Sequence, residues 1–312
     1  MAEIRIAIIG FGKIAQDQHV PAIAANSAFR LVAAVAPRGT PSVDVPVFRD
    51  HGEMLRQIRP DAVAICTPPA PRHAIARDCL DAGVHVLLEK PPGITLGEVS
   101  DLARLSEQRR VTLFTTWHAQ YNESVGEAAR LIAEQGLRSM RIDWLEDVEK
   151  WHPGQQWIWQ PGGFGVFDAG INALSIATLL SPSVLLLRKA RMHLHRGGQQ
   201  PIAAMLTMES AGAVGPIEAV LDWRHKGEER WTIEIMTVTG TQLLLSEGGA
   251  VLRIGDGDPR RGAGSEYPAL YAGFEELVRT RESHVDVEPL RLTADAYLLA
   301  ERLSADNETP TR

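Results

Sequence analysis

Lys90 is the residue whose sequence surroundings most favour chemistry. It lies in Glu89-Lys90-Pro91-Pro92, directly after the apolar run Val84 to Leu88. The two prolines restrict the turn, so the lysine is held in place. The carboxyl end of a buried strand is also where a doubly wound sheet binds its ligands. A lysine fixed there, away from water, is predicted to serve as a base or as a hydrogen-bond donor to a reacting hydroxyl.

Asp168 and Asn172 form a second pair of candidate catalytic residues. They follow the glycine-rich segment Gly162-Gly-Phe-Gly and lie four residues apart, so they share one face of a helix. Neither belongs to the apolar positions of that helix. The alternative is a pair of solvated side chains, as on any amphipathic helix. The glycines and the aromatic loop before them favour a pair that faces a cleft.

That loop, Trp151-His-Pro-Gly-Gln-Gln-Trp-Ile-Trp159, combines aromatic rings with hydrogen-bonding groups. A sugar needs both, because ring faces pack on its C–H surfaces and polar groups bind its hydroxyls. Tryptophans also build protein cores, so not every one is assigned to a ligand. Trp151 and His152 are the better candidates, because they immediately follow the charged segment Glu146 to Lys150.

A glycine turn near the N-terminus is predicted to bind a dinucleotide. Gly10-Phe-Gly12-Lys-Ile-Ala15 follows the apolar run Ile4 to Ile9 and opens a helix. Gly10 permits the tight turn, Gly12 lets the backbone approach a pyrophosphate, and the helix N-terminus supplies donors. Glycines in such turns often serve geometry alone, but the alternating strands and helices that follow favour a cofactor site. The predicted cofactor-binding residues are Gly10, Gly12, Lys13, Ile14, Pro37, Arg38, Thr67, Pro68, Glu89 and Lys90.

The end of the second predicted strand bears on the choice of cofactor. NAD enzymes usually carry Asp or Glu there, which binds the ribose 2′-hydroxyl. This chain has Ala36-Pro37-Arg38 instead. Arg38 can pair with the 2′-phosphate of NADP, and a solvated arginine in a turn is the alternative. We expect NADP, or the use of both NADP and NAD.

The order of apolar segments predicts an α/β protein of two domains. Residues 1–120 alternate strand-like and helix-like runs, which is typical of a Rossmann domain with a doubly wound parallel sheet. Pro21 is expected to interrupt the first helix. Residues 121–312 should form a substrate-binding α/β domain, because successive strands between 184 and 254 predict a largely antiparallel open sheet. Its last helix, Leu290 to Leu303, is the element expected to pack back on the first domain.

Composition narrows the class of protein. The chain has 312 residues, a net charge of −7 and 45% hydrophobic residues, which fits a globular protein and argues against nucleic-acid binding. No apolar run is long enough to span a membrane, and two cysteines cannot make a disulfide framework. We therefore expect a cytoplasmic protein. His193 and His195 alternate on one predicted strand, but without a third ligand they predict no metal site.

The glycine turn, Glu89-Lys90-Pro91 and the spacing of Asp168 and Asn172 together resemble the glucose–fructose oxidoreductase/inositol dehydrogenase/MocA (Gfo/Idh/MocA) family. The likeness covers essentially the whole chain. Within the family, three longer stretches resemble the branch of bacterial D-galactose and L-arabinose 1-dehydrogenases. They are Gly12 to Pro21, Trp151 to Trp159 and Asp168 to Ile176.

The resemblance implies roles for individual residues. Lys90 and Asp168 would be catalytic, and Asn172 would contact the sugar near the reacting carbon. Many family members have a histidine base where this chain has Asn172, and an amide cannot take that role. Proton abstraction would therefore fall to Lys90 or Asp168. The resemblance also implies a sugar pocket formed by His118, Glu146, Trp151, His152 and Trp231, and a homodimer.

These observations predict an NAD(P)-dependent dehydrogenase that oxidises D-galactose or L-arabinose at the anomeric carbon to the aldonolactone. One alternative is a catalytically silent sugar or nucleotide sensor on the same fold, because a fold alone does not fix a function. Another is a dehydrogenase of a polyol or of another sugar derivative, since one changed pocket contact can alter substrate preference.

Overall fold

The computed structural model describes residues 3–39 and 41–304. Contacts divide the chain into two compact units. The first comprises Met1–His118 and Ser265–Val287, and the second comprises Ala119–Gly264 and Glu288–Arg312. The helix that returns to the first unit is therefore α8 (Glu266–Thr280), and the final helix α9 (Glu288–Leu299) belongs to the second. The predicted boundary at residue 120 therefore leaves out Ser265–Val287, which belong to the first unit.

The first unit is built on a six-stranded parallel sheet in the order β3-β2-β1-β4-β5-β6. This confirms the predicted doubly wound Rossmann sheet. Its apolar strands are buried on both faces, as helices on both sides require. The strands are β1 (Ile4–Ile9), β2 (Phe29–Val35), β3 (Val47–Phe48), β4 (Ala62–Ile65), β5 (His85–Leu88) and β6 (Leu113–Thr115).

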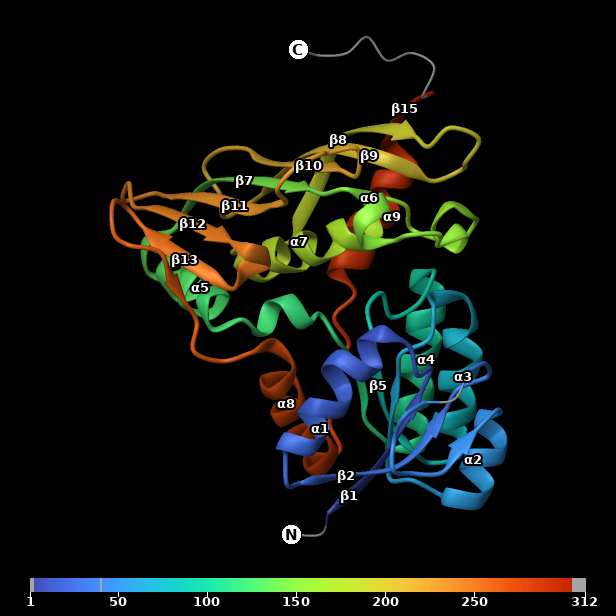
Figure 1. The fold of residues 1–312 in the computed structure, drawn as a ribbon. Coiled ribbons are helices and arrows are strands. Elements are labelled where there is room, and N and C mark those ends of the chain that lie inside the picture. Colours follow the sequence, from blue (N-terminus) through green and yellow to red (C-terminus); the bar gives the residue numbers. More distant parts are fainter. Residues whose placement is uncertain (1–2, 40, 305–312) are drawn as a thin grey trace. The chain divides into compact units, whose positions relative to one another are not determined.

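Helices cover both faces of this sheet (Figure 1). On one face lie α2 (His51–Ile58), α3 (Pro69–Asp81) and α4 (Leu96–Arg109), and on the other lie α1 (Val20–Ala25) and α8. A capping box of Thr95 and Glu98 begins α4, as that spacing favours. Aromatic rings join α8 to the sheet, with Phe274 stacked 5.9 Å from Phe29 and 6.0 Å from Phe114.

Pro21 does not interrupt the first helix, contrary to expectation. Residues Ala15–His19 form a π-helical turn in which the Val20 N–H donates to the Ala15 carbonyl, and α1 begins directly after it. The proline thus falls at the start of α1, where a helix does not need its missing N–H. The wider turn also directs the buried side chain of His19 inward.

The second unit is built on a nine-stranded sheet in the order β14-β13-β12-β11-β7-β10-β9-β8-β15. Only the pairs β7–β10 and β8–β15 are parallel, so the prediction of a largely antiparallel sheet is confirmed. The strands are β7 (Leu137–Leu145), β8 (Leu185–Leu194), β9 (Pro201–Ser210), β10 (Ile217–Asp222), β11 (Arg230–Thr237), β12 (Gln242–Ser246), β13 (Val251–Ile254), β14 (Arg260–Arg261) and β15 (Glu301–Leu303).

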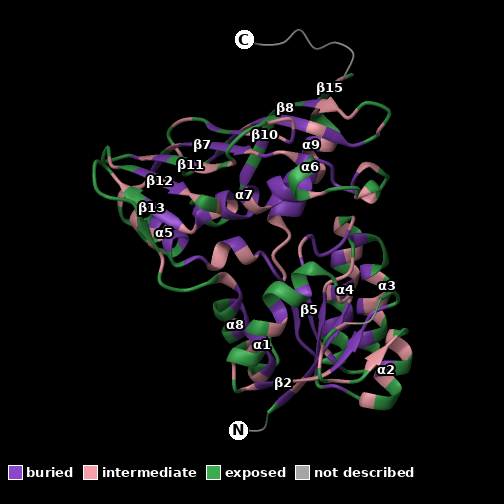
Figure 2. Ribbon diagram, in the orientation of Figure 1, coloured by how far each residue is buried: buried purple, intermediate pink, exposed green. Residues whose placement is uncertain are grey.

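One face of this sheet is covered by α5 (Glu123–Gln135), α7 (Phe167–Leu180) and α9, and α7 is almost entirely buried (Figures 1 and 2). Gly170 lets α7 approach the sheet closely, because a Cβ there would lie 2.5 Å from Leu221 Cδ1. Short helical turns complete the unit: α6 (Val148–Trp151), η3 (Gln156–Trp159) and η4 (Glu247–Gly249), while η2 (His118–Tyr121) leads into it.

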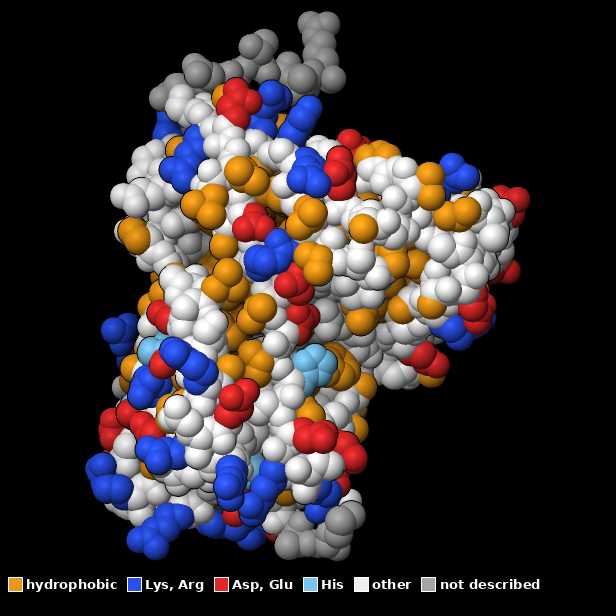
Figure 3. Space-filling view, turned by 180° about the vertical axis from the view of Figure 1, so that it is seen from behind, with side chains coloured by type: hydrophobic (Ala, Val, Ile, Leu, Met, Phe, Trp, Pro, Cys, Tyr) orange, Lys and Arg blue, Asp and Glu red, His pale blue; other side chains and the backbone are white. Residues whose placement is uncertain are grey.

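The helix predicted at Leu290 to Leu303 ends earlier in the structure, at Leu299, because Glu301–Leu303 pair with β8 as the edge strand β15. Charged side chains of both signs are scattered over the surface, and Lys and Arg are frequent on the first unit, at the bottom of Figure 3. No helix in the described ranges is long and apolar enough to cross a membrane.

Candidate active site

The glycine turn of the first unit has the geometry that a dinucleotide requires. Gly10 has φ +91°, and a Cβ there would lie 2.7 Å from the backbone nitrogen of Thr67, so only glycine fits. At Gly12 an added Cβ would meet nothing within 4 Å. Gly10 therefore closes the turn against the end of β4, whereas the space at Gly12 is open to a ligand.

Thr67 supplies an independent sign that this edge of the sheet binds a ligand. Its Oγ1 is buried, and no residue of the described ranges forms a hydrogen bond with it. Buried hydroxyls normally have a partner, and the oxygens of a bound dinucleotide can provide one. The residues at hand thus fit an NAD(P) cofactor: Gly10, Gly12 and Thr67 would hold its phosphates beside the helical turn that begins at Ala15.

The other predicted cofactor residues lie around this turn. Pro37 and Arg38 are exposed after β2, and Arg49 holds their loop by donating to the carbonyls of Ala36, at 2.8 Å, and Gly39. Lys13 forms an ion pair with Asp17 on the exposed side of the helical turn, where Ile14 is 37% exposed, and Pro68 precedes α3.

Lys90 leaves β5 in a turn fixed by buried groups. Its backbone N–H donates to Glu89 Oε2 at 2.9 Å, and the Lys90–Pro91 peptide bond is cis. The guanidinium of Arg72, which is 2% exposed, donates to the carbonyls of Glu89, Pro91 and Thr67. Arg72 was not singled out in the sequence, because a lone arginine within a predicted helix carries no signal for such a contact.

The carboxylate of Glu89, only 3% exposed, lies inside the first unit. Its Oε1 receives hydrogen bonds from the Tyr267 hydroxyl at 2.7 Å and from His19 Nε2 at 3.0 Å. Burial alone would raise the pKa of Glu89, but the hydrogen bond and charge of His19, with help from His118 and Tyr267, lower it well below its usual range. Glu89 is therefore ionised.

His118 also lies in the first unit, beside this group. Its Nδ1 is 2.6 Å from Glu266 Oε2, and its ring stacks on Tyr267 at 5.5 Å. Burial would lower the pKa of His118, but the adjacent Glu266 and the charge of Glu89 raise it above its ordinary value. The structure thus places His118 against α8, whereas the other predicted sugar-binding residues belong to the second unit.

In the second unit, three strands bring polar and aromatic residues to one edge of the sheet. β7 and β10 are parallel and paired in register to Leu145 and Asp222, so the next residues, Glu146 and Trp223, lie at the same edge. Antiparallel pairing brings Trp231 of β11 opposite Trp144. The indole N–H groups of Trp223 and Trp231 each donate at 2.8 Å to one carboxylate oxygen of Glu146, which is 3% exposed.

His152 lies between two carboxylates of this edge. Its Nε2 is 3.9 Å from Glu146 Oε1 and 4.0 Å from Asp168 Oδ2, and its ring is 4.8 Å from that of Trp223. The structure thereby brings together Glu146, His152 and Asp168, which come from the end of β7, the loop after α6 and the start of α7. Trp223 was missed in the sequence, because tryptophans of a strand end are indistinguishable from core residues there.

The remaining predicted residues surround this cluster. Asn172 lies one turn of α7 after Asp168, and its Oδ1 is buried without a hydrogen-bond partner among the described residues. Trp151 is 43% exposed, donates to Glu229 at 3.1 Å and lies 5.1 Å from the ring of Trp231. An unpaired acceptor, two carboxylates and aromatic rings make a surface suited to hydroxyl groups.

His193 lies on β8, and His195 follows the end of that strand. His195 stacks on Trp159 at 4.0 Å. In the part of the chain that the structure describes, no group of three or more His, Cys, Asp or Glu side chains could hold a metal ion.

Comparison with known proteins agrees with this geometry. A family described as "Oxidoreductase family, NAD-binding Rossmann fold" (Gfo/Idh/MocA) matches residues 4–116. A galactose 1-dehydrogenase of Pseudomonas fluorescens is 44% identical over 307 residues, covering 98% of this chain and 99% of that protein.

Solved structures give the same result. The crystal structure of a D-galactose-1-dehydrogenase from Rhizobium etli superposes with a TM-score of 0.92 at 43% identity, over 98% of this chain and 97% of that one. A 3-ketoreductase from Actinomadura kijaniata in complex with NADP shares the fold, with a TM-score of 0.85 at 18% identity, over 97% of this chain and 99% of the other. The chain therefore belongs to the Gfo/Idh/MocA family of oxidoreductases with an NAD-binding Rossmann domain.

Proposed function

We propose that this chain is an NAD(P)-dependent sugar 1-dehydrogenase that oxidises D-galactose, and also L-arabinose, at the anomeric carbon to the aldonolactone. The observation that carries the proposal is the cluster of Glu146, His152 and Asp168 with two indole donors. It occurs in a chain that resembles two galactose 1-dehydrogenases over nearly its whole length. Directed polar groups beside aromatic rings are what a sugar ring requires.

In the proposed reaction, Lys90 Nζ accepts the proton of the anomeric hydroxyl, and Asp168 acts as a second catalytic group towards the sugar. When bound, the cofactor supplies a nicotinamide ring as the acceptor of the hydride. The Oδ1 atom of Asn172 accepts a hydrogen bond from a sugar hydroxyl, which gives this buried acceptor a partner. Glu146 and His152 bind further hydroxyls, while the faces of Trp151 and Trp231 exclude water from the sugar. Fixed groups of this kind favour the transition state because they need no reorganisation.

The first experiment measures reduced cofactor at 340 nm with D-galactose, L-arabinose, D-fucose, D-glucose, D-xylose and myo-inositol, each with NAD and with NADP. We expect rapid reduction with galactose and arabinose. Absence of turnover with every sugar, in protein that still binds cofactor, would refute the proposal and favour a sensor.

The role of Lys90 is tested with Lys90→Met, which keeps most of the length of the side chain and removes the amine. We expect kcat to fall by about 10³-fold or more, since base catalysis and positioning are lost together. Binding of NAD(P), followed by quenching of tryptophan fluorescence, should change little. Turnover close to that of the unmodified enzyme would remove Lys90 from the mechanism.

We propose further that the enzyme uses NADP at least as well as NAD. The loop after β2 carries Arg38 and no carboxylate, and Arg49 holds that loop by its carbonyls. Arg38→Ala should lower kcat/KM for NADP by about tenfold or more, the contribution of a lost charge-assisted contact. The value for NAD should change far less, and an equal loss for both cofactors would contradict this role.

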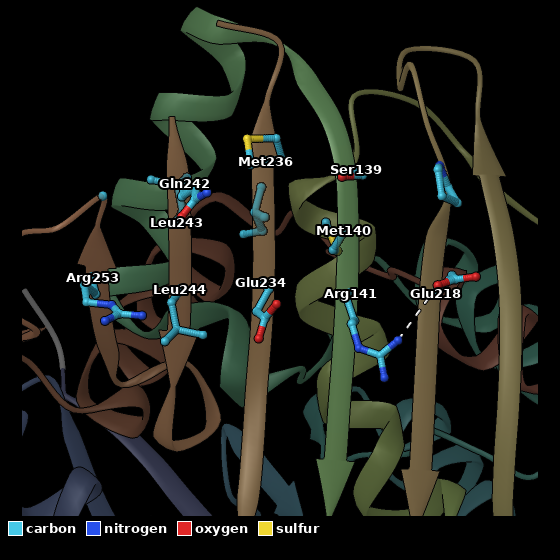
Figure 4. Close-up of a pocket in the computed structure, with 13 residues that line it drawn as sticks. Ser139, Met140, Arg141, Glu218, Glu234, Met236, Gln242, Leu243, Leu244 and Arg253 are labelled. Atoms are coloured by element: carbon cyan, nitrogen blue, oxygen red, sulfur yellow. Dashed lines mark ion pairs between the residues drawn. The ribbon is translucent and has the colours of Figure 1, made fainter. Parts of the chain in front are cut away.

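We also propose that two copies associate through the face of the nine-stranded sheet opposite α5, α7 and α9. Apolar and charged side chains alternate there, among them Leu244, Met236, Glu234 and Arg253, and Arg141 lies 3.9 Å from Glu218 (Figure 4). Light scattering should give twice the mass of one chain. Leu244→Arg should yield monomers, whereas the control Leu298→Arg, at a residue 82% exposed on α9, should not.

We propose that the protein is located in the cytoplasm, a reducing compartment, because Cys66 and Cys79 are both free thiols.

A further inference from the structure

A buried group of four side chains lies next to the backbone of Lys90 in the first unit. The proposed function gives no role to the contacts within this group. It consists of His19, Glu89, Tyr267 and Tyr271, from three segments that are distant in sequence. His19 is completely buried. Its Nδ1 is 2.8 Å from the Tyr271 hydroxyl and its Nε2 is 3.0 Å from Glu89 Oε1, so both ring nitrogens are used inside the protein.

Glu89 connects this group to Lys90. One carboxylate oxygen, Oε1, accepts from His19 and from Tyr267, while the other, Oε2, accepts the backbone N–H of Lys90 at 2.9 Å. A carboxylate is planar and rigid, so fixing Oε1 also fixes the direction of Oε2. The orientation of the Lys90 backbone, and therefore the direction in which its side chain leaves the turn, depends on what holds Oε1.

The pKa values of both partners in this buried contact are shifted towards their charged forms. Burial by itself would lower the pKa of His19, but the Cys66, Tyr271 and Glu89 side chains outweigh it and raise the pKa well above the usual range. The pKa of Glu89 is lowered, as described above. A buried ion pair adds little net stability compared with apolar side chains of the same volume. Stability alone therefore does not account for an imidazolium at this position.

The backbone at His19 is also specialised. The residue ends the π-helical turn Ala15–His19, which follows the glycine turn directly, and π turns within helices are frequent at functional sites. Because its ring is fully buried, His19 cannot touch the sugar. Any effect on the reaction must pass through Glu89.

We propose that His19 is a positioning residue of the reaction, which fixes Lys90 through the carboxylate of Glu89. This inference rests on the proposed role of Lys90 as proton acceptor. A displacement of the amine by about 1 Å is enough to cost about 10²-fold in rate, whereas the residues proposed to hold the sugar hydroxyls and the phosphates of the cofactor lie outside this buried group. Loss of the His19 contact should therefore lower kcat much more than it weakens binding.

The test compares His19→Leu with His19→Gln. Leucine fills the site but cannot donate to Glu89, whereas the Nε2 of glutamine can replace the imidazole Nε2. We expect His19→Leu to lower kcat with galactose by about 10- to 100-fold, with the sugar KM and the Kd for NAD(P) within about threefold. His19→Gln should recover most of kcat. Equal losses in both variants, or parallel changes in kcat, KM and Kd, would indicate a merely structural role and overturn the proposal.

A matched pair of tyrosine variants keeps the proposal testable if His19→Leu fails to fold. Tyr267→Phe and Tyr271→Phe each remove one hydroxyl from the same buried group, but only the Tyr267 hydroxyl contacts Glu89. We expect the larger loss of kcat from Tyr267→Phe. The opposite order would contradict positioning through Glu89.

Lys90→Met separates this inference from the proposed function. If Lys90→Met keeps its turnover, the proposed mechanism fails and takes the role of His19 with it. If Lys90→Met is inactive while His19→Leu has the kcat of the unmodified enzyme, only the role of His19 is wrong. A double variant adds a further check: in Glu89→Gln enzyme, His19→Leu should cause little additional loss, because contacting residues in one pathway are not additive.

Discussion

Glu89 and Glu146 are buried to the same extent, 3% exposed each, but groups of different charge hold them. In the first unit, Glu89 accepts from the His19 imidazolium, the Tyr267 hydroxyl and a backbone N–H. In the second unit, the indoles of Trp223 and Trp231 donate to Glu146. The first carboxylate has a positive partner at 3.0 Å, whereas the donors to the second are neutral.

The difference indicates two uses of a buried carboxylate. The contact with His19 compensates the charge of Glu89. We therefore infer that Glu89 serves mainly to position the backbone of Lys90, which donates to its Oε2. Indole donors orient Glu146 through neutral N–H groups, and a carboxylate is a strong acceptor for hydroxyl donors. His152, with its Nε2 at 3.9 Å from Glu146, provides a second group at the same edge. Our proposals therefore give the two carboxylates different roles: Glu89 positions the backbone of Lys90, and Glu146 binds sugar hydroxyls.

The largest expected effect is a difference in unfolding free energy between variants of the two carboxylates. Glu89→Gln leaves the buried imidazolium of His19 without its counter-charge, and should cost about 3 kcal/mol of unfolding free energy. Glu146→Gln keeps an amide oxygen for one indole, and should cost about 1 kcal/mol. Urea denaturation at pH 7 measures both. Equal costs would show that the two sites are held in the same way.

Two glycines extend the comparison, because Gly170 is required by packing and we propose that Gly12 is required by the cofactor. Gly170→Ala places a Cβ 2.5 Å from Leu221 Cδ1, and Leu221 is fully buried, so its side chain must shift within the packed core. We expect a loss of about 2 kcal/mol. Gly12→Ala meets nothing within 4 Å. It should leave stability nearly unchanged and raise the Kd for NAD(P) by about tenfold or more. Unfolding and fluorescence titration of both variants distinguish these outcomes.

The comparison also explains what the sequence could predict. The segments at Gly10 and Lys90 carry short-range signals, because a parallel strand, a turn and a helix follow one another within a few residues. The fold class and the cofactor turn could therefore be predicted. The prediction of Asp168 and Asn172 as site residues rests on a signal of the same kind, their spacing on one helix, which the structure shows as α7.

The groups that hold the two carboxylates could not be predicted, because they come from distant segments. Tyr267 reaches Glu89, and Tyr271 reaches His19, because α8 returns to the first unit after the chain has passed through most of the second. Trp223 reaches Glu146 through the parallel pairing of β7 and β10, which are separated by two other strands in the sequence. No short stretch of the sequence contains a pattern that predicts either of these long-range contacts. The π-helical turn before Pro21 was missed for a related reason, since a proline pattern does not reveal a change of helix type.

A smaller effect is expected from the indoles that hold Glu146. Trp223→Phe removes one donor to a carboxylate oxygen while keeping an aromatic ring in a site that is 1% exposed. We expect the KM for galactose to rise about five- to tenfold, equivalent to one lost hydrogen bond, with kcat less affected. Trp231→Phe should behave similarly. Trp159→Phe is the control, because its ring packs against Trp223 at 5.5 Å without donating to Glu146. A change in kcat alone would instead assign Glu146 to the chemical step.

The smallest expected effect concerns pH, and it tests whether charge compensation extends from Glu89 to its neighbour His118. The pKa of His118 is raised because the charge and hydrogen bond of Glu266 outweigh the opposing effect of burial. A histidine whose pKa is higher in the folded than in the unfolded state adds stability that is complete below about pH 6.5. That stability is lost as the pH rises through the folded-state pKa.

Glu266→Gln should therefore cost about 1 kcal/mol of unfolding free energy at pH 6 and progressively less towards pH 9. The matched control on the same helix is Glu275→Gln, because Glu275 pairs with Arg279 at 2.8 Å and arginine keeps its charge throughout this range. Its cost should be the same at both pH values. If the loss of unfolding free energy on Glu266→Gln were also the same at pH 6 and pH 9, His118 would be neutral. Charge compensation by a histidine in the first unit would then be confined to the contact between His19 and Glu89.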